Sequence, residues 1–174
     1  MIRTRVGYAG GTTLAPTYRS IGDHTETLQL DFDPSVISYG ELLDEFLASH
    51  NACRAPFSTQ YRSAIFVHDD DQRAQAEAKL RAFESERNDK AATSVEGYGG
   101  FTLAEDYHQK YRLRRDRALA AELEERYPEL QDFVDSPTVT RANAFVAGYG
   151  DEGLRSRDLP RMGLTYVSQR RLSN

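Results

Sequence analysis

Cys53 is the one cysteine among the 174 residues of this chain, and a thiol is well suited to nucleophilic or redox chemistry. Arg54 beside it would favour the thiolate electrostatically. An unactivated thiol is only a few per cent ionised near neutral pH, so we favour an incidental cysteine in a loop. A single cysteine cannot form an internal disulfide, which fits a reducing compartment, and we expect a cytoplasmic protein.

The four histidines offer no recognisable metal site. The chain contains neither an HxH nor an HExxH pattern, and His24 and His108 lack metal-ligand spacing with the acidic residues. Hydrogen bonding is therefore the expected role of these two side chains, and we predict no bound metal.

The charge balance argues against a nucleic-acid-binding protein. Lys plus Arg is 22 and Asp plus Glu is 27, for a net charge of −5. An arginine-rich run at 112–117 would suit phosphate, but glutamates at 122–125 follow it, so a salt-bridged helix face is the better interpretation. No apolar run reaches membrane-spanning length, and we expect no membrane partner.

The elements that must position these groups mix strands and helices up to about residue 111. Leu28, Leu30 and Phe32 alternate with polar residues, as in a half-buried strand. Ser38 followed by Glu41 predicts a capping box at a helix start. The predicted strands are 3–8, 25–32, 61–68 and 93–96; the predicted helices are 38–49 and 70–88, the latter with Ala74, Ala78, Leu80 and Phe83 inward.

From about residue 116 the pattern becomes helical. Leu119, Leu123 and Tyr127 recur at helical spacing, and Pro128 ends that helix. Ser136 and Pro137 begin another. We predict an α/β fold of the α+β type, with a mixed central sheet flanked by helices over residues 1–115 and a helical C-terminal extension over 116–174.

Six segments occur in the order VGYAGG (6–11), PTY (16–18), HTE (24–26), FDPSVISYGELLDEF (32–46), TQYRSAIF (59–66) and AEDYHQKY (104–111). Together they resemble the A-type peptide methionine sulfoxide reductases (peptide-methionine (S)-S-oxide reductases). A further stretch, residues 132–150, is similar to the C-terminal extension of one branch of that family.

The resemblance implies the reduction of methionine-(S)-sulfoxide, free or in peptides. A thiolate attacks the sulfoxide sulfur, the oxygen must be protonated to leave, and the cysteine becomes a sulfenic acid that another thiol resolves. Glu26, Tyr18 and Tyr61 match the family residues that surround the oxygen, and His24 and His108 would lie at the periphery of the pocket. Without the resemblance, we would interpret Glu26 as a solvent-facing residue and the two tyrosines as packed aromatic side chains.

The chain also departs from the family pattern. The nucleophilic cysteine belongs to a GCFWG motif upstream of the VGY segment, and only five residues precede Val6. The family's C-terminal resolving cysteines are absent, and a family aspartate falls on Pro56. We expect an N-terminally shortened chain, lacking the first strand, the cysteine motif and the first helix, and inactive as written, with Cys53 a poor substitute.

The sequence is also compatible with two other functions. One is a pseudoenzyme that binds oxidised methionine without reducing it; another is an interaction module whose helical C-terminus docks a partner. For the family reading we expect protein repair under oxidative stress, no prosthetic cofactor, an external reductant of the thioredoxin type, and a monomer.

Overall fold

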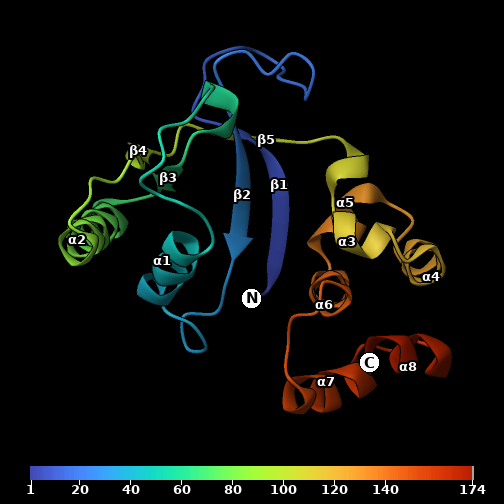
Figure 1. The fold of residues 1–174 in the computed structure, drawn as a ribbon. Helices are drawn as coiled ribbons and strands as arrows, with labels where there is room; N and C mark the ends of the chain where they lie inside the picture. Colours follow the sequence, from blue (N-terminus) through green and yellow to red (C-terminus); the bar gives the residue numbers. More distant parts are fainter. Residues whose placement is uncertain (174) are drawn as a thin grey trace. The chain divides into compact units, whose positions relative to one another are not determined.

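The computed structural model describes residues 1–173 and divides into two compact units (Figure 1). The mixed unit contains residues 6–28 and 32–104, and the helical unit contains residues 1–5, 29–31 and the chain from 105 onward. The strands β1 (Arg3–Ala9) and β2 (Thr25–Asp31) contribute residues to both units. The predicted division at residue 115 stays a prediction.

The described strands form two small sheets, which confirms the α/β class. One has the order β2-β1-β5, and β5 (Phe101–Leu103) runs antiparallel to β1 with Gly7 opposite Leu103. The other pairs β3 (Ala64–Val67) in parallel with β4 (Ser94–Gly97). Parallel neighbours need a long crossover, and the helix α2 (Asp70–Arg87) supplies it.

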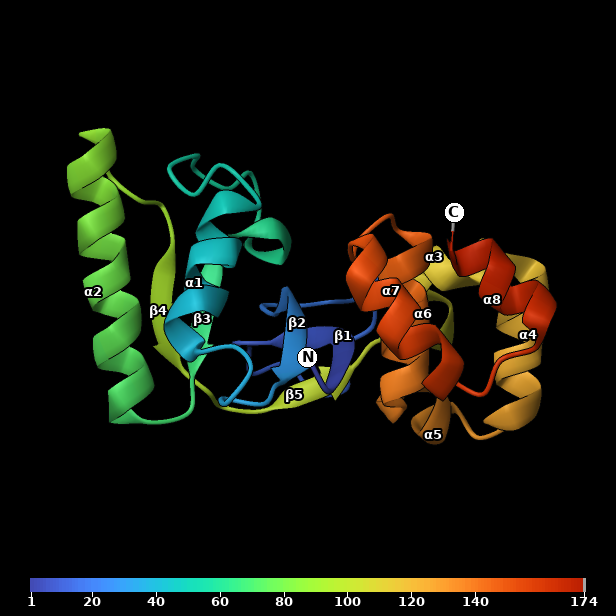
Figure 2. The same cartoon turned by 90° about the horizontal axis from the view of Figure 1, so that it is seen from below.

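The helix α1 (Tyr39–Ala48) begins at the predicted capping box. The Ser38 hydroxyl accepts a hydrogen bond from the Glu41 backbone N–H at 3.2 Å, and the Glu41 carboxylate accepts one from the Ser38 N–H at 2.8 Å. Leu43 and Leu47 on this helix are buried against β3 and α2 (Figure 2). This packing forms the apolar core of the mixed unit.

The buried face of α2 differs in part from the prediction. Ala76 and Leu80 are buried and Phe83 packs against them, whereas Ala74 and Ala78 are exposed. The prediction that Ala74 and Ala78 point inward was wrong. Two residues correspond to about 200° of helix rotation, so they lie on the opposite face from Ala76 and Leu80.

The helical unit packs around leucine and valine side chains. Leu119 and Leu123 are fully buried, as their spacing predicted. The Ser136 hydroxyl accepts a hydrogen bond from the Val139 N–H and caps the helix that begins at Pro137. The helices are α3 (Tyr111–Arg114), α4 (Arg117–Arg126), α5 (Leu130–Asp135), α6 (Pro137–Val146), α7 (Glu152–Asp158) and α8 (Tyr166–Ser173).

Lys110 is a buried cation within the helical unit, at 4% exposure. Its ammonium group donates to the Thr4 carbonyl at 2.7 Å, to the Thr4 hydroxyl at 3.0 Å and to the Thr140 hydroxyl at 2.9 Å. Burial, reinforced by the positive charge of Arg5, lowers the pKa of Lys110 to about 8, against the opposing effect of Asp135.

This lowered pKa predicts a specific pH dependence. Between about pH 8 and the ordinary lysine value near 10.4, the unfolded chain binds more protons at this site than the folded chain. The free energy of unfolding of the unmodified protein, relative to Lys110→Met, should therefore rise with pH across that window. Urea unfolding of both proteins at several pH values measures the difference; a constant difference contradicts the prediction.

Candidate functional site

Four polar side chains of the mixed unit form a connected group, which we call the Glu26 cluster: Tyr18, Glu26, Gln60 and Tyr61. The Gln60 side-chain nitrogen donates to the Glu26 carboxylate at 2.7 Å and to the Tyr61 hydroxyl at 3.1 Å. The Tyr61 and Tyr18 hydroxyl oxygens lie 3.5 Å apart. Glu26, Tyr18 and Tyr61, singled out in the sequence, are thus brought together; Gln60 was not.

Two short segments position the cluster. Glu26 is the second residue of β2, and Gln60 and Tyr61 end the 3₁₀ turn η1 (Thr59–Tyr61). The Thr25 hydroxyl donates to the Thr59 carbonyl at 3.1 Å, which joins the start of β2 to the turn. Because each threonine immediately precedes a cluster residue, this bond sets Glu26 against Gln60.

Arg62 also contacts the Thr25 hydroxyl, and it connects Thr25 to β4. Its Nε donates to the Thr25 hydroxyl at 2.7 Å, and both terminal nitrogens pair with the Glu96 carboxylate on β4, one of them at 2.9 Å. A fork-to-fork pair of this kind fixes orientation as well as distance. Hydrogen bonding from Arg62 lowers the pKa of Glu96, so the pair stays charged at neutral pH.

The loop that carries Tyr18 is fixed by Asp23 and His24. The Asp23 carboxylate accepts hydrogen bonds from the backbone N–H groups and the hydroxyls of Thr12 and Thr13, and these donors hold its pKa well below the ordinary range. At Gly22, where φ is +62°, an added Cβ would lie 2.3 Å from the Thr13 hydroxyl oxygen. The loop therefore needs glycine there.

His24 is 8% exposed and is used on both sides of its ring. Its Nδ1 accepts from the Gly11 N–H at 3.3 Å, and its Nε2 lies 2.8 Å from the Thr13 carbonyl oxygen. A carbonyl can only accept, so Nε2 carries the hydrogen and the ring is neutral. The structure places His24 within the Tyr18 loop.

The Tyr61 hydroxyl is held protonated. Its hydrogen bond with Tyr18, together with some desolvation of this exposed side chain and the negative charge of Glu26, raises the pKa of Tyr61 to about 12. The Phe57 ring packs beside it with ring centroids 5.2 Å apart. A phenol in this state offers a hydrogen-bond donor next to a carboxyl group at neutral pH.

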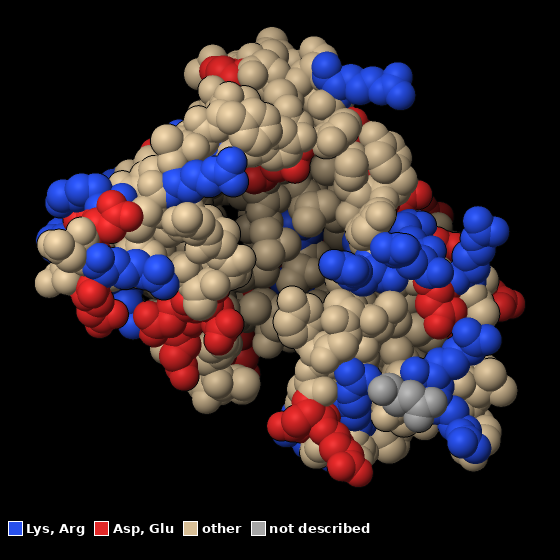
Figure 3. All heavy atoms as spheres, in the orientation of Figure 1, with Lys and Arg blue, Asp and Glu red and all other residues tan. Residues whose placement is uncertain are grey.

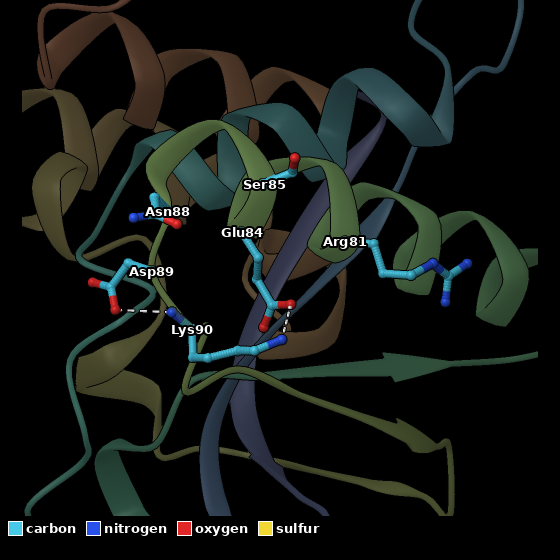
Figure 4. A pocket seen from close by; sticks show the side chains of 6 residues that line it. All are labelled: Arg81, Glu84, Ser85, Asn88, Asp89 and Lys90. Atoms are coloured by element: carbon cyan, nitrogen blue, oxygen red, sulfur yellow. Dashed lines mark hydrogen bonds and ion pairs between the residues drawn. The ribbon is translucent and has the colours of Figure 1, made fainter.

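Cys53 lies in a different electrostatic environment. Desolvation, a hydrogen bond with Asp89 and the negative charges of Asp89 and Glu84 raise the pKa of this thiol, and Arg87 opposes them only in part. The net effect of these groups opposes the thiolate that Arg54 was expected to favour. Glu84 and Asp89 line a groove at the C-terminal end of α2 (Figure 4), where Lys90 pairs with Glu84 at 3.0 Å.

His108 belongs to the helical unit, in the 3₁₀ turn η2 (Asp106–His108), and its ring packs on Tyr107 at 4.2 Å between centroids. Nearby, Arg114 pairs with Asp106 and, at 2.5 Å, with Glu124, as the salt-bridged interpretation of the arginine run predicted. On the face drawn in Figure 3, acidic and basic side chains are interspersed.

The described residues form neither a metal site nor a membrane-spanning helix. Within residues 1–173 no three His, Cys, Asp or Glu side chains are grouped to hold a metal ion. Among the helices of that same stretch, none combines the length and the apolar character that crossing a membrane requires.

The Arg62 pair generates a stability prediction. Arg62→Ala should lower the free energy of unfolding by about 1–3 kcal/mol, because it leaves Glu96 and Thr25 without their half-buried partner. Arg81→Ala is the matched control, since the pair of Arg81 with Glu77 is an exposed i, i+4 contact worth ~0.5 kcal/mol or less. Chemical unfolding compares the two; equal losses would count against a special role for Arg62.

The tyrosine pair generates a titration prediction. Tyr18→Phe removes the largest cause of the raised pKa of Tyr61, so this hydroxyl should titrate closer to the ordinary value of about 10. NMR of ring-labelled tyrosine follows the titration, with Tyr98→Phe as a control elsewhere in the chain. A Tyr61 titration unchanged by Tyr18→Phe would mean that the two hydroxyls are not coupled.

Comparison with known proteins identifies relatives for most of the chain. The peptide methionine sulfoxide reductase family matches residues 1–137. A peptide methionine sulfoxide reductase of Drosophila melanogaster is 41% identical over 167 residues, which are 95% of this chain and 67% of that protein. The A5 reductase of Arabidopsis thaliana is 37% identical over 66% of this chain, which spans only 48% of that relative.

Solved structures of methionine sulfoxide reductases also resemble this chain. Mxr1 from Saccharomyces cerevisiae in reduced form superposes with a TM-score of 0.59 at 32% identity, covering 66% of this chain and 71% of that one. Methionine sulfoxide reductase A of Corynebacterium diphtheriae gives 0.54 at 27% identity, covering 66% and 63%. The chain belongs to the peptide methionine sulfoxide reductase family, and its resemblance is to the A type.

Proposed function

We propose that this chain carries the oxygen-binding and proton-donating half of a methionine sulfoxide reductase site. Tyr18 and Tyr61 hydrogen-bond the sulfoxide oxygen, and Glu26 supplies a proton to it. The observation that carries the proposal is the connected contact from the Glu26 carboxylate through Gln60 to the two hydroxyls.

The chemistry of a sulfoxide fits such a cluster. The oxygen is the negative end of the S–O dipole. Hydrogen bonds from the phenols stabilise that negative charge and make the sulfur more electrophilic. A thiol then takes the oxygen as a sulfenic acid and leaves the thioether. A second thiol condenses with the sulfenic acid to give a disulfide and water, so two thiols are oxidised for each sulfoxide reduced.

Cys53 is poorly suited to supply the first thiol. The groups that control its ionisation are Asp89, Glu84 and Arg87, none of them in the Glu26 cluster, and its pKa is raised. We therefore propose that these 174 residues bind methionine sulfoxide without reducing it. A thioredoxin-type reductant, protein repair and a cytoplasmic location stay proposals at the level of the family.

Calorimetry and a reductase assay test the proposal together. A peptide containing methionine-(S)-sulfoxide should bind measurably and the same peptide with methionine should not, while dithiothreitol should support no turnover. Tyr61→Phe removes one hydrogen-bond donor to the sulfoxide oxygen, so affinity should fall roughly 2- to 12-fold.

Cys53→Ser is the control for the thiol, and it should change neither binding nor turnover. Turnover that Cys53→Ser abolishes would show that this thiol is the nucleophile. Equal affinity for the methionine peptide and the sulfoxide peptide would contradict the proposal that the Glu26 cluster binds the sulfoxide oxygen.

A further inference from the structure

We infer that Gln60 is a positioning residue of this site, which links Glu26 to Tyr61 and keeps the Tyr61 hydroxyl hydrogen directed to the substrate oxygen. The inference rests on the proposed function and deepens it. It starts from one nitrogen atom that contacts both a carboxylate and a phenol of the cluster.

The amide orientation follows from the contact with Glu26. The side-chain nitrogen of Gln60 lies 2.7 Å from a Glu26 oxygen. An amide nitrogen can only donate, and the Glu26 oxygen that it faces accepts, so the NH₂ end of Gln60 faces Glu26.

The second contact then has only one possible direction. An amide nitrogen donates and does not accept, so at 3.1 Å it donates its other hydrogen to the Tyr61 oxygen. The hydroxyl hydrogen of Tyr61 cannot be used toward Gln60. It is left for the Tyr18 oxygen, 3.5 Å away, or for a bound sulfoxide oxygen.

The backbone keeps Gln60 in place independently of its side chain. The Tyr61 N–H donates to the Ser58 carbonyl at 3.3 Å, and Thr59 receives the Thr25 hydroxyl at 3.1 Å. Removing the amide group should therefore alter the hydrogen bonds of the cluster without unfolding the turn.

Gln60→Leu and Gln60→Glu test this role in the full chain. Gln60→Leu removes both donations, and since donation by Gln60 lowers the pKa of Tyr61, that hydroxyl should titrate at a higher pH than in the unmodified protein. Fluorinated tyrosine, whose phenol is more acidic, brings the titration into a range measurable by fluorine NMR. Affinity for the methionine-(S)-sulfoxide peptide should fall at least threefold.

Gln60→Glu keeps the size of the side chain but faces Glu26 with a second carboxylate. Two such groups cannot both ionise easily, so the variant should bind the sulfoxide peptide weakly at pH 7.5 and recover toward pH 5, where a protonated carboxyl group can donate again. A purely space-filling role predicts no such pH profile.

Gln75→Leu is the matched control, because Gln75 makes a similar contact with Asp71 at 2.8 Å on α2. It should leave both the Tyr61 titration and sulfoxide affinity unchanged. An unchanged Tyr61 titration in Gln60→Leu, with the fold intact, overturns the positioning role whether or not sulfoxide binds. Failure of the unmodified chain to bind sulfoxide overturns the proposed function and the substrate-directed part of this inference.

Discussion

The geometry of the Glu26 cluster depends on one hydroxyl group. Thr25 donates to the Thr59 carbonyl and accepts from Arg62, so a single side chain joins the start of β2, the turn before β3 and, through Glu96, the strand β4. Each cluster residue is adjacent to a member of this connection or lies in the loop that Asp23 ties down. The acid and the phenols therefore lie on short segments, but those segments are fixed by bonds between sequence-distant residues.

Local signals in the sequence predicted the local structure well. The capping box at Ser38 depends on residues three apart, and the structure contains it. The buried leucines of α4 follow from their spacing, and the predicted strand β2 is present, but Leu28, which the alternation placed on its buried side, is 56% exposed. On α2 the prediction buried Ala74 and Ala78, whereas the structure buries Ala76 two residues along. Alanine is common on both faces of a charged helix, so its position does not indicate which face is buried.

The features that sequence reasoning missed are those that tertiary contacts create. Gln60 has no pattern of its own; its only signal was its place next to Tyr61 in a family-like segment. The three-residue strand β5 follows a glycine-rich stretch that suggests a turn, and its pairing with β1 defines it. The environment of Cys53 could not be predicted from the sequence either, because its neighbours Glu84 and Asp89 lie more than 30 residues away, at the C-terminal end of α2.

The buried position of Lys110 has a practical consequence for studying the helical unit. The chain has three lysines; the side chain of Lys90 is exposed and that of Lys79 is partly exposed, whereas Lys110 is enclosed with all its donors used. Its amine deprotonates unusually readily, yet an acylating reagent can reach it only when the surrounding helices separate. The rate at which Lys110 is acylated, compared with the other two amines, would thus report how often this part of the molecule opens.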